Sequence, residues 1–266
     1  MTVLTRELRA SYAFVERNFN LTRRYWGWEV AFMVYSVAGA LAVTLIGRDQ
    51  QSEQLVVSLM IGATFWNYLS VVFSIIAEQI SWERWEGTLE YTMMAPVRRI
   101  SQLFGSTVFA LIWGVIHATV VVVVLILFFG IDLSEADFVA AGVLLLIGSF
   151  SIIGIGMMAA ILPLMYVERG DQMVFVLNSL LLLISGVYYS VTILPEWMQA
   201  ISALSPATYI LEGVRQALID GVPLDQMLNL VWPLIVMAFV FIPLGAWVFG
   251  RAERYAKRTG KLKRVG

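Results

Sequence analysis

Long apolar runs separated by short polar segments dominate this chain. A helix needs about 20 apolar residues to cross the roughly 30 Å hydrocarbon core of a bilayer. Six runs reach about that length, at residues 28–47, 55–77, 101–129, 139–163, 172–191 and 228–250. The pattern therefore predicts an all-α integral membrane protein, with six transmembrane helices in a bundle at 28–250 and a single domain over 1–266.

Residues 1–26 precede the first run and follow a different pattern. Within 3–24, apolar side chains recur at steps of three and four, and arginines lie roughly opposite them. The apolar positions are Leu4, Leu8, Tyr12, Val15 and Phe19, and the arginines are Arg6, Arg9, Arg17 and Arg24. This pattern favours an amphipathic helix lying in the membrane interface. A soluble tail that packs on a partner is the alternative. The segment lacks the short apolar core of a cleavable signal peptide.

Positive charge is divided unequally between the two sides that six spans would create. Of the 18 Lys and Arg residues, only Arg48 and Arg215 fall on the side away from the termini. The others lie in the N-terminal segment, in the loops near 84, 98 and 169, and in the basic tail at 251–266. Because cytoplasmic loops are enriched in Lys and Arg, we expect both termini to be cytoplasmic.

The outer segment between residues 191 and 226 contains signals for two short helices. Pro195 can occupy the first turn of a helix that carries Trp197. Ser205 and Pro206 resemble the N-cap and first position of a second helix, which runs through Tyr209. Each helix is too short to cross the bilayer, so the segment predicts an external helical hairpin.

The composition limits the chemistry that the chain can perform. It is 59% hydrophobic and 14% charged, with a mean hydropathy of +0.79, a net charge of −1, no cysteine and one histidine, His117. These values exclude a disulfide scaffold and thiolate or His-cluster metal sites, and they give no general attraction to nucleic acid. There is no P-loop motif for ATP and no catalytic constellation. We therefore expect no enzyme activity and no bound cofactor or metal, and a lipid-modifying enzyme is the weakest alternative.

Buried charge is nearly absent from the six runs. Glu29 lies at the cytoplasmic start of the first, where it can reach water, and His117 is interpreted as a packing residue rather than a proton relay. Proton-coupled transporters and voltage sensors need ionisable groups within the membrane. The energy for any transport by this chain is therefore expected to come from another polypeptide.

The segment at residues 81–96 combines charge and tryptophan more densely than any other. On a helical wheel its positions divide into an apolar face and an adjacent acidic stripe. The apolar face holds Trp82, Trp85, Leu89 and Met93, and the stripe holds Glu83, Glu86 and Glu90. We interpret 81–94 as one cytoplasmic helix, with a bend or close approach at Gly87 and a stop at Pro96 before Arg98 and Arg99. Anionic lipid would repel the stripe, which favours docking on a protein over a solvated surface helix.

The same segment carries a family resemblance. It contains Gly87-Thr88-Leu89-Glu90 followed by Ala95-Pro96, and the outer side contains the stretches 185–190, 194–199 and 205–209 in matching order. In these features the chain resembles ABC-2-type permeases, the transmembrane subunits of bacterial ABC exporters. Trp85 departs from the family, which more often has a charged residue at this position.

The resemblance implies a subunit of an ATP-driven exporter in a bacterial or archaeal cytoplasmic membrane. Two permeases, identical or closely related, would pair, and each would dock a separate ATPase subunit that holds ATP and Mg. The segment 81–94 would be the coupling helix, and the external helices would shape the exit. The implied ATPase-docking residues are Glu83, Arg84, Trp85, Glu86, Gly87, Thr88, Leu89 and Glu90.

The resemblance also implies an amphipathic cargo, such as a drug-like molecule, a lipid or a lipid-linked glycan. We expect its path to follow the interface of two permeases. The candidate lining residues are Trp66, Tyr68, Phe73, Tyr188 and Tyr189. The alternative for each is an interfacial aromatic belt or ordinary packing. A membrane anchor for a cytoplasmic partner is the alternative to transport.

Overall fold

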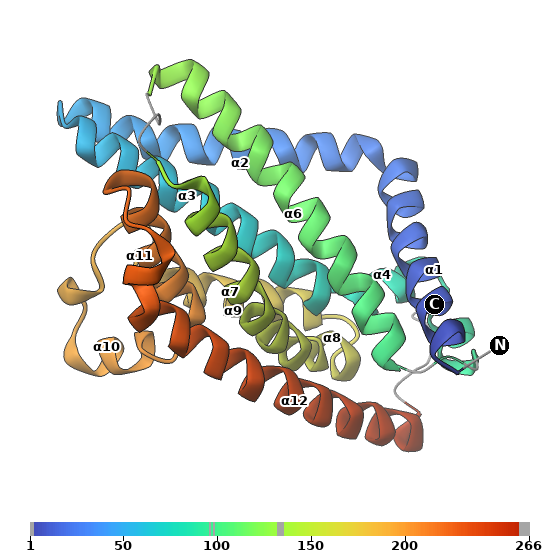
Figure 1. The fold of residues 1–266 in the computed structure, drawn as a ribbon. Coiled ribbons are helices and arrows are strands. Elements are labelled where there is room, and N and C mark those ends of the chain that lie inside the picture. The colour runs from blue at the N-terminus through green and yellow to red at the C-terminus, as the bar shows by residue number, and fades with distance from the viewer. Residues whose placement is uncertain (1–2, 96, 98, 132–135, 261–266) are drawn as a thin grey trace.

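The computed structural model describes residues 3–95, 97, 99–131 and 136–260, and this part of the chain is helical throughout, without strands. The helices are α1 (Val3–Arg24), α2 (Trp26–Asp49), α3 (Glu53–Ala77), α4 (Gln79–Trp85), α5 (Leu89–Met94), α6 (Arg99–Phe129), α7 (Phe138–Ala159), α8 (Ile161–Met165), α9 (Gly170–Ile184), η1 (Val191–Ile193), α10 (Glu196–Ser202), α11 (Pro206–Ile219), η2 (Leu224–Met227) and α12 (Leu228–Thr259). Figure 1 shows their arrangement. Pro96, Arg98 and the tail from Lys261 onward lie outside the described residues.

Five helical segments are long and apolar enough to cross a membrane. They are α2, α3, α6, α7 together with α8, and α12. These segments confirm five of the six predicted spans, with ends that differ by a few residues except at the C-terminus, where α12 continues to Thr259. The apolar runs predicted these elements well because a long apolar sequence has few other stable conformations in a bilayer.

The predicted span at 172–191 is shorter than expected. Its helix, α9, has 15 residues, which corresponds to about 22 Å at 1.5 Å per residue. The helix ends before Gly186, whose φ of 65° lies in the left-handed region that glycine adopts most readily. The described residues thus contain five long spans and one shorter apolar helix rather than six full-length spans.

The non-helical segment that follows α9 is buried inside the protein. Arg215 of α11 donates hydrogen bonds to the carbonyl of Gly186, at 3.0 Å, and to the carbonyl of Val187. The hydroxyls of Ser185 and Ser205 lie 2.8 Å apart. Irregular backbone is tolerated at membrane depth only where the protein satisfies it. Arg215 therefore stabilises the chain where it leaves helical structure within the bundle.

The predicted external hairpin is present as α10 and α11. Pro206 occupies the first turn of α11, as predicted, whereas Pro195 is the residue that precedes α10 rather than part of its first turn. Trp197 is exposed, and the Tyr209 hydroxyl donates to the Ala203 carbonyl at 2.9 Å. Contrary to a simple surface hairpin, α11 packs against α3, α7 and α12 and forms part of the core.

The helices α7 and α12 approach most closely at two glycines. A Cβ atom on Gly245 would lie 2.6 Å from the Gly154 carbonyl oxygen, and a Cβ atom on Gly154 would lie 2.5 Å from the carbonyl carbon of Phe241. Small residues allow such backbone contact between membrane helices. This seam joins the C-terminal helix to the core.

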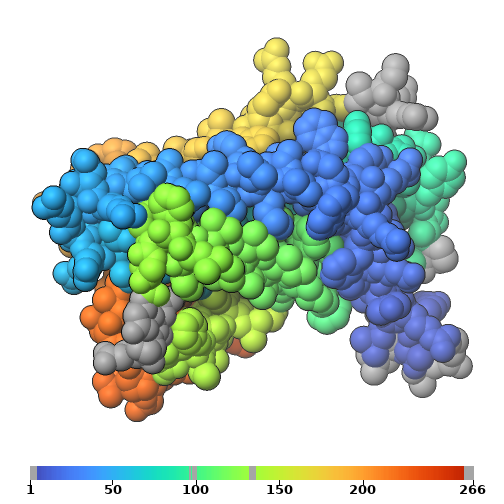
Figure 2. Space-filling model, turned by 90° about the horizontal axis from the view of Figure 1, so that it is seen from above, coloured from blue at the N-terminus to red at the C-terminus, as the bar shows by residue number. Residues whose placement is uncertain are grey.

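The bundle has two distinct ends. The helices α1, α4 and α5 and the C-terminal end of α12 lie at one end, which we call the docking end after the role predicted for residues 81–94, and α10 and α11 lie at the other (Figure 1). Figure 2 shows α2 and α6 side by side on one face, with α1 beyond their end. Both ends of the described chain therefore lie at the same end of the bundle.

The hydrogen bonds from Arg215 to the Gly186 and Val187 carbonyls, which we call the Arg215 clamp, lead to a stability prediction. Arg215→Ala leaves two buried carbonyls without donors, so we expect a loss of roughly 2–4 kcal/mol of unfolding free energy. Arg48→Ala is the matched control. Like Arg215, Arg48 lies on the side away from the termini, but its side chain is exposed. Thermal unfolding in detergent micelles measures both. Equal melting temperatures for the two variants would contradict the clamp.

Candidate functional site

The segment at 81–94 is two short helices rather than the single helix predicted from the wheel. Helix α4 ends in a hydrogen-bonded motif, in which Gly87 N–H donates to the Arg84 carbonyl at 3.0 Å and Thr88 N–H donates to the Glu83 carbonyl at 2.8 Å. This is the Schellman arrangement, which requires a left-handed residue after the helix. Gly87 supplies it with a φ of 70°. The predicted bend is thus a complete helix end.

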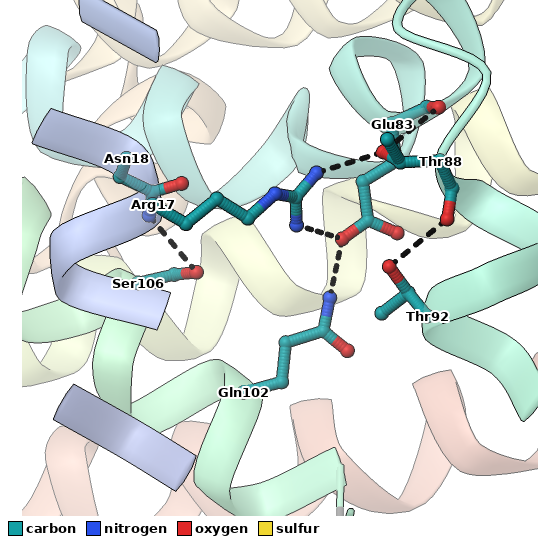
Figure 3. Close-up of polar contacts among 7 residues, drawn as sticks. All are labelled: Arg17, Asn18, Glu83, Thr88, Thr92, Gln102 and Ser106. Atoms are coloured by element: carbon teal, nitrogen blue, oxygen red, sulfur yellow. Dashed lines mark hydrogen bonds and ion pairs between the residues drawn. The ribbon is translucent and has the colours of Figure 1, made fainter. Parts of the chain in front are cut away.

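Glu83 does not belong to an exposed acidic stripe. Its side chain is 1% exposed, and its Oε1 accepts from Arg17 Nη1 at 2.8 Å and from Gln102 Nε2 at 2.7 Å (Figure 3). Arg17 comes from α1 and Gln102 from α6, so the carboxylate joins three separate elements. Arg17 also donates to the Thr88 hydroxyl at 2.9 Å. We call Arg17, Glu83, Thr88 and Gln102 the inner network.

Glu86 also faces the N-terminal helix. It accepts a hydrogen bond from the Tyr25 hydroxyl, and its Oε2 lies 3.5 Å from Arg24 Nη1. The bond to Glu86 raises the pKa of Tyr25 above its ordinary value. The predicted stripe of three exposed carboxylates is therefore wrong, since Glu90 alone among Glu83, Glu86 and Glu90 is exposed. The helix break explains the error, because wheel angles do not continue across Gly87.

The face that remains exposed is mostly apolar. Trp85, Tyr91 and Met94 are 61%, 72% and 73% exposed, and Glu90 lies among them. Leu89, in contrast, packs in a buried cluster that includes Phe249 of α12. We call the exposed residues Trp85, Glu90, Tyr91 and Met94 the tip. A partner protein can reach the tip without disturbing the inner network.

Arg84 joins the segment to α8. Its Nη1 donates to the Pro163 carbonyl at 2.7 Å, and its Nη2 donates to the Leu164 carbonyl at 3.0 Å. Burial lowers the pKa of Arg84, and the charge of Asp171 partly offsets this effect. Arg84 therefore clamps α4 to α8, and its predicted role in docking stays a prediction.

The N-terminal helix packs on α6 through polar residues. The Ser101 hydroxyl donates to Glu7 at 2.6 Å, and a Cβ atom on Gly105 would lie 2.4 Å from the Ser11 carbonyl oxygen. The prediction that Arg17 lies on an outer polar face is wrong, because Arg17 points toward Glu83. Leu8 and Tyr12 are exposed, so the expected interfacial role remains a prediction for them.

A cavity of about 590 Å³ lies between α1, α2, α3, α4, α6 and α9. It extends from Arg17 and Glu83 at the docking end to Tyr188 beyond α9. Two of the predicted path residues, Trp66 and Tyr188, line it. The other three do not: Tyr68 and Phe73 are buried in the core, and the Tyr189 hydroxyl donates to the Leu183 carbonyl.

A polar stripe on α3 lines this cavity and was missed in the sequence. It consists of Asn67, Ser70, Ser74 and Glu78, at steps of three and four along one helical face. Asn178 of α9 donates to the Ser70 hydroxyl at 2.6 Å. The spacing itself was the available signal, since polar residues in phase within an apolar helix mark an interior or wet face.

Three carboxylates line the cavity, and one of them, Glu83, is paired with Arg17. Glu29 accepts a hydrogen bond from Trp113 Nε1 at 3.2 Å and lies 3.8 Å from His117 Nε2, and its side chain is 23% exposed, so it lines the cavity and can also reach solvent. Glu78 lies one residue beyond the end of α3. Burial raises the pKa of Glu78 to about 7, with a smaller contribution from Asp171 and an opposing hydrogen bond from Ser74. Over the described parts of the chain, no three His, Cys, Asp or Glu side chains cluster as metal ligands.

The comparison with known families decides the identity of this architecture. The family model "ABC-2 type transporter" matches residues 10–219. The chain belongs to this family. It is thus the membrane domain, or permease, of an ABC-2 type transporter. The match covers the inner network, the tip and the cavity, and ends with α11.

Individual relatives are distant. The chain is similar to the probable multidrug ABC transporter permease YbhR of Escherichia coli, in strain K12 and in O157:H7. Identity is 25% over 170 residues, which cover 62% of this chain and 45% of the relative. The matched part therefore spans about half the length of these ABC-2 permeases.

The inner network leads to a second stability prediction. Glu83→Ala leaves Arg17 and Gln102 without their shared acceptor, and we expect a loss of roughly 2–3 kcal/mol, below the usual cost of breaking a fully buried pair because Arg17 keeps some solvent contact. Glu90→Ala is the control and should change stability by less than about 0.5 kcal/mol. Chemical denaturation in micelles separates the two. If Glu90→Ala is as destabilising as Glu83→Ala, the inner network does not hold this segment.

Proposed function

We propose that this chain is the membrane subunit of an ATP-driven exporter that moves an amphipathic substrate out across the cytoplasmic membrane. The observation that carries the proposal is the tip: an exposed, largely apolar surface at the docking end, held in place by buried hydrogen bonds. Family membership supports it. The description of the YbhR relatives as probable multidrug ABC transporter permeases agrees with a drug-like cargo.

The contacts of the tip suggest how force from an ATPase reaches the spans. Glu83 connects α4 to α1 and α6, and Arg84 connects α4 to α8 at the end of α7. Short charge-assisted hydrogen bonds of this kind resist separation more than exposed contacts do. A push on the tip is therefore transmitted to α6 and α7 instead of being absorbed by a loose loop.

The proposed assembly contains two permeases and two ATPase subunits, and the ATPases hold ATP and Mg. The cavity between α2, α3 and α9 would form the substrate path. The shorter α9, continued by the segment 185–190, whose first three residues are buried, would complete a sixth crossing, because Arg215 satisfies the backbone at Gly186 and Val187. The distribution of Lys and Arg supports a cytoplasmic docking end.

Docking of an ATPase at the tip can be tested by introducing a charged side chain there. Met94→Asp puts a carboxylate on the exposed apolar surface, and we expect at least a tenfold weaker retention of the ATPase subunit, since a buried unpaired charge costs several kcal/mol. Ile193→Asp is the control, because Ile193 is equally exposed but lies at the opposite end. Co-purification from the native host, with mass spectrometry to identify a P-loop ATPase, gives the readout.

Two outcomes would contradict the proposal. If Met94→Asp retains the ATPase as wild type does, the tip is not the docking surface. If the wild-type chain co-purifies with partners that lack any ATPase, the chain is a membrane anchor rather than a transport subunit.

A further inference from the structure

The cavity has an uncompensated negative charge. Among the described residues, its charged lining consists of Arg17, Glu29, Glu78 and Glu83. Arg17 is paired with Glu83 at 2.8 Å. Glu29 and Glu78 therefore face the cavity without a permanent cation of their own, although His117 lies near Glu29.

Acceptor atoms in the cavity lack donors. Glu78 Oε1 and Asn67 Oδ1 are buried and have no hydrogen-bond partner among the described residues. Both lie on the polar stripe along α3 and its C-cap, eleven residues apart and therefore about 16 Å from each other along the helix axis. Buried acceptors without partners are rare in native proteins and call for an explanation, such as a bound group. A positively charged group beside Glu78 would compensate its buried carboxylate.

The rest of the lining suits an apolar body. Aromatic side chains from several helices face the cavity, among them Phe32 of α2, Trp66 of α3 and Phe175 of α9. Aromatic faces attract cations as well as apolar groups. The volume of about 590 Å³ lies within the range of roughly 300–1,000 Å³ that is typical of small-molecule sites.

We propose that this cavity binds lipophilic organic cations, with Glu78 and Glu29 as the residues that select positive charge. The inference rests on the proposed transport function and specifies its substrate class. A lipid-linked phosphate or another anionic amphiphile would be repelled, because neither Glu29 nor Glu78 is paired with a Lys or Arg and charge interactions are stronger inside a protein than in water.

Protonation of Glu78 gives the site a pH dependence. With a pKa of about 7, Glu78 is mostly ionised at pH 8 and mostly neutral at pH 6. The ionised form attracts a cation, so affinity should rise with pH, by up to about tenfold over this range. The charged and titratable groups on the surrounding elements are Asp171 on α9, Arg84 and Glu83 on α4, Arg17 on α1, Glu29 on α2 and His117 on α6.

A pair of nearly isosteric probes tests the inference. Methyltriphenylphosphonium carries one positive charge, and triphenylphosphine oxide has the same three rings and is neutral. Equilibrium dialysis with the full chain in nanodiscs, corrected for empty nanodiscs, should give at least tenfold tighter binding of the phosphonium at pH 8. Equal affinity for the two probes, or no binding of the phosphonium, would overturn the proposal.

Substitutions assign the effect to the named carboxylates. Glu78→Gln should weaken phosphonium binding at least tenfold, abolish its pH dependence between pH 6 and 8, and leave binding of the oxide unchanged. Glu29→Gln should weaken phosphonium binding and keep the pH dependence. Glu53→Gln is the control, on the exposed far end of the same helix, and should bind as wild type. An unchanged Glu78→Gln variant, with a normal melting temperature, would refute the role of Glu78.

This experiment is independent of transport. Because it uses neither ATP nor the ATPase, binding of the phosphonium together with the absence of ATP-driven export would reject the proposed function and keep the cation site. Export of other substrates together with the absence of phosphonium binding would keep the proposed transport function and reject the cation site.

Discussion

The buried carboxylate of Glu83 is the contact on which the docking end depends. A charge in this position is costly unless a cation and further donors meet it, and here Arg17 and Gln102 do so from two other helices. The requirement fixes α1 across the end of the bundle and orients α4 relative to α6. It also leaves the tip residues Trp85, Glu90, Tyr91 and Met94 to face outward, whereas Leu89 packs on the buried side. The shape of the tip is thus a consequence of satisfying one charge.

The sequence predicted the spans because their signal is local. A run such as 101–129 is apolar throughout, and its helix follows from length and composition. The short α9 could not be found in the same way, because its end depends on Arg215, which lies 28 and 29 residues beyond the carbonyls that it binds. An apolar run does not show where a distant side chain will satisfy the backbone.

The sequence singled out the segment 81–94 but did not predict how its side chains are oriented. Gly87 was correctly singled out, yet its left-handed φ ends a helix and thereby changes the direction of every later side chain. Glu83 was assigned to solvent because its partner, Arg17, lies 66 residues earlier. Tyr68 and Phe73 were chosen as path residues for being aromatic, whereas the cavity follows the polar positions of α3. Periodicity identifies faces, and only the packing of helices decides which face meets the cavity.

At the docking end, arginines are exposed on the surface, whereas glutamates face the cavity. Arg6, Arg9, Arg23 and Arg24 are exposed along α1, whereas Glu29 and Glu78 face the cavity. With this end in the cytoplasmic leaflet, as the distribution of Lys and Arg predicts, the arginines lie beside anionic headgroups. The same headgroups concentrate amphipathic cations at the membrane surface. A cation that leaves them for the cavity exchanges lipid phosphate for protein carboxylate, so it keeps an opposite charge while its apolar body moves between aromatic side chains. If the cavity binds cations as proposed, arginine outside and glutamate inside would give favourable electrostatics from the leaflet to the cavity.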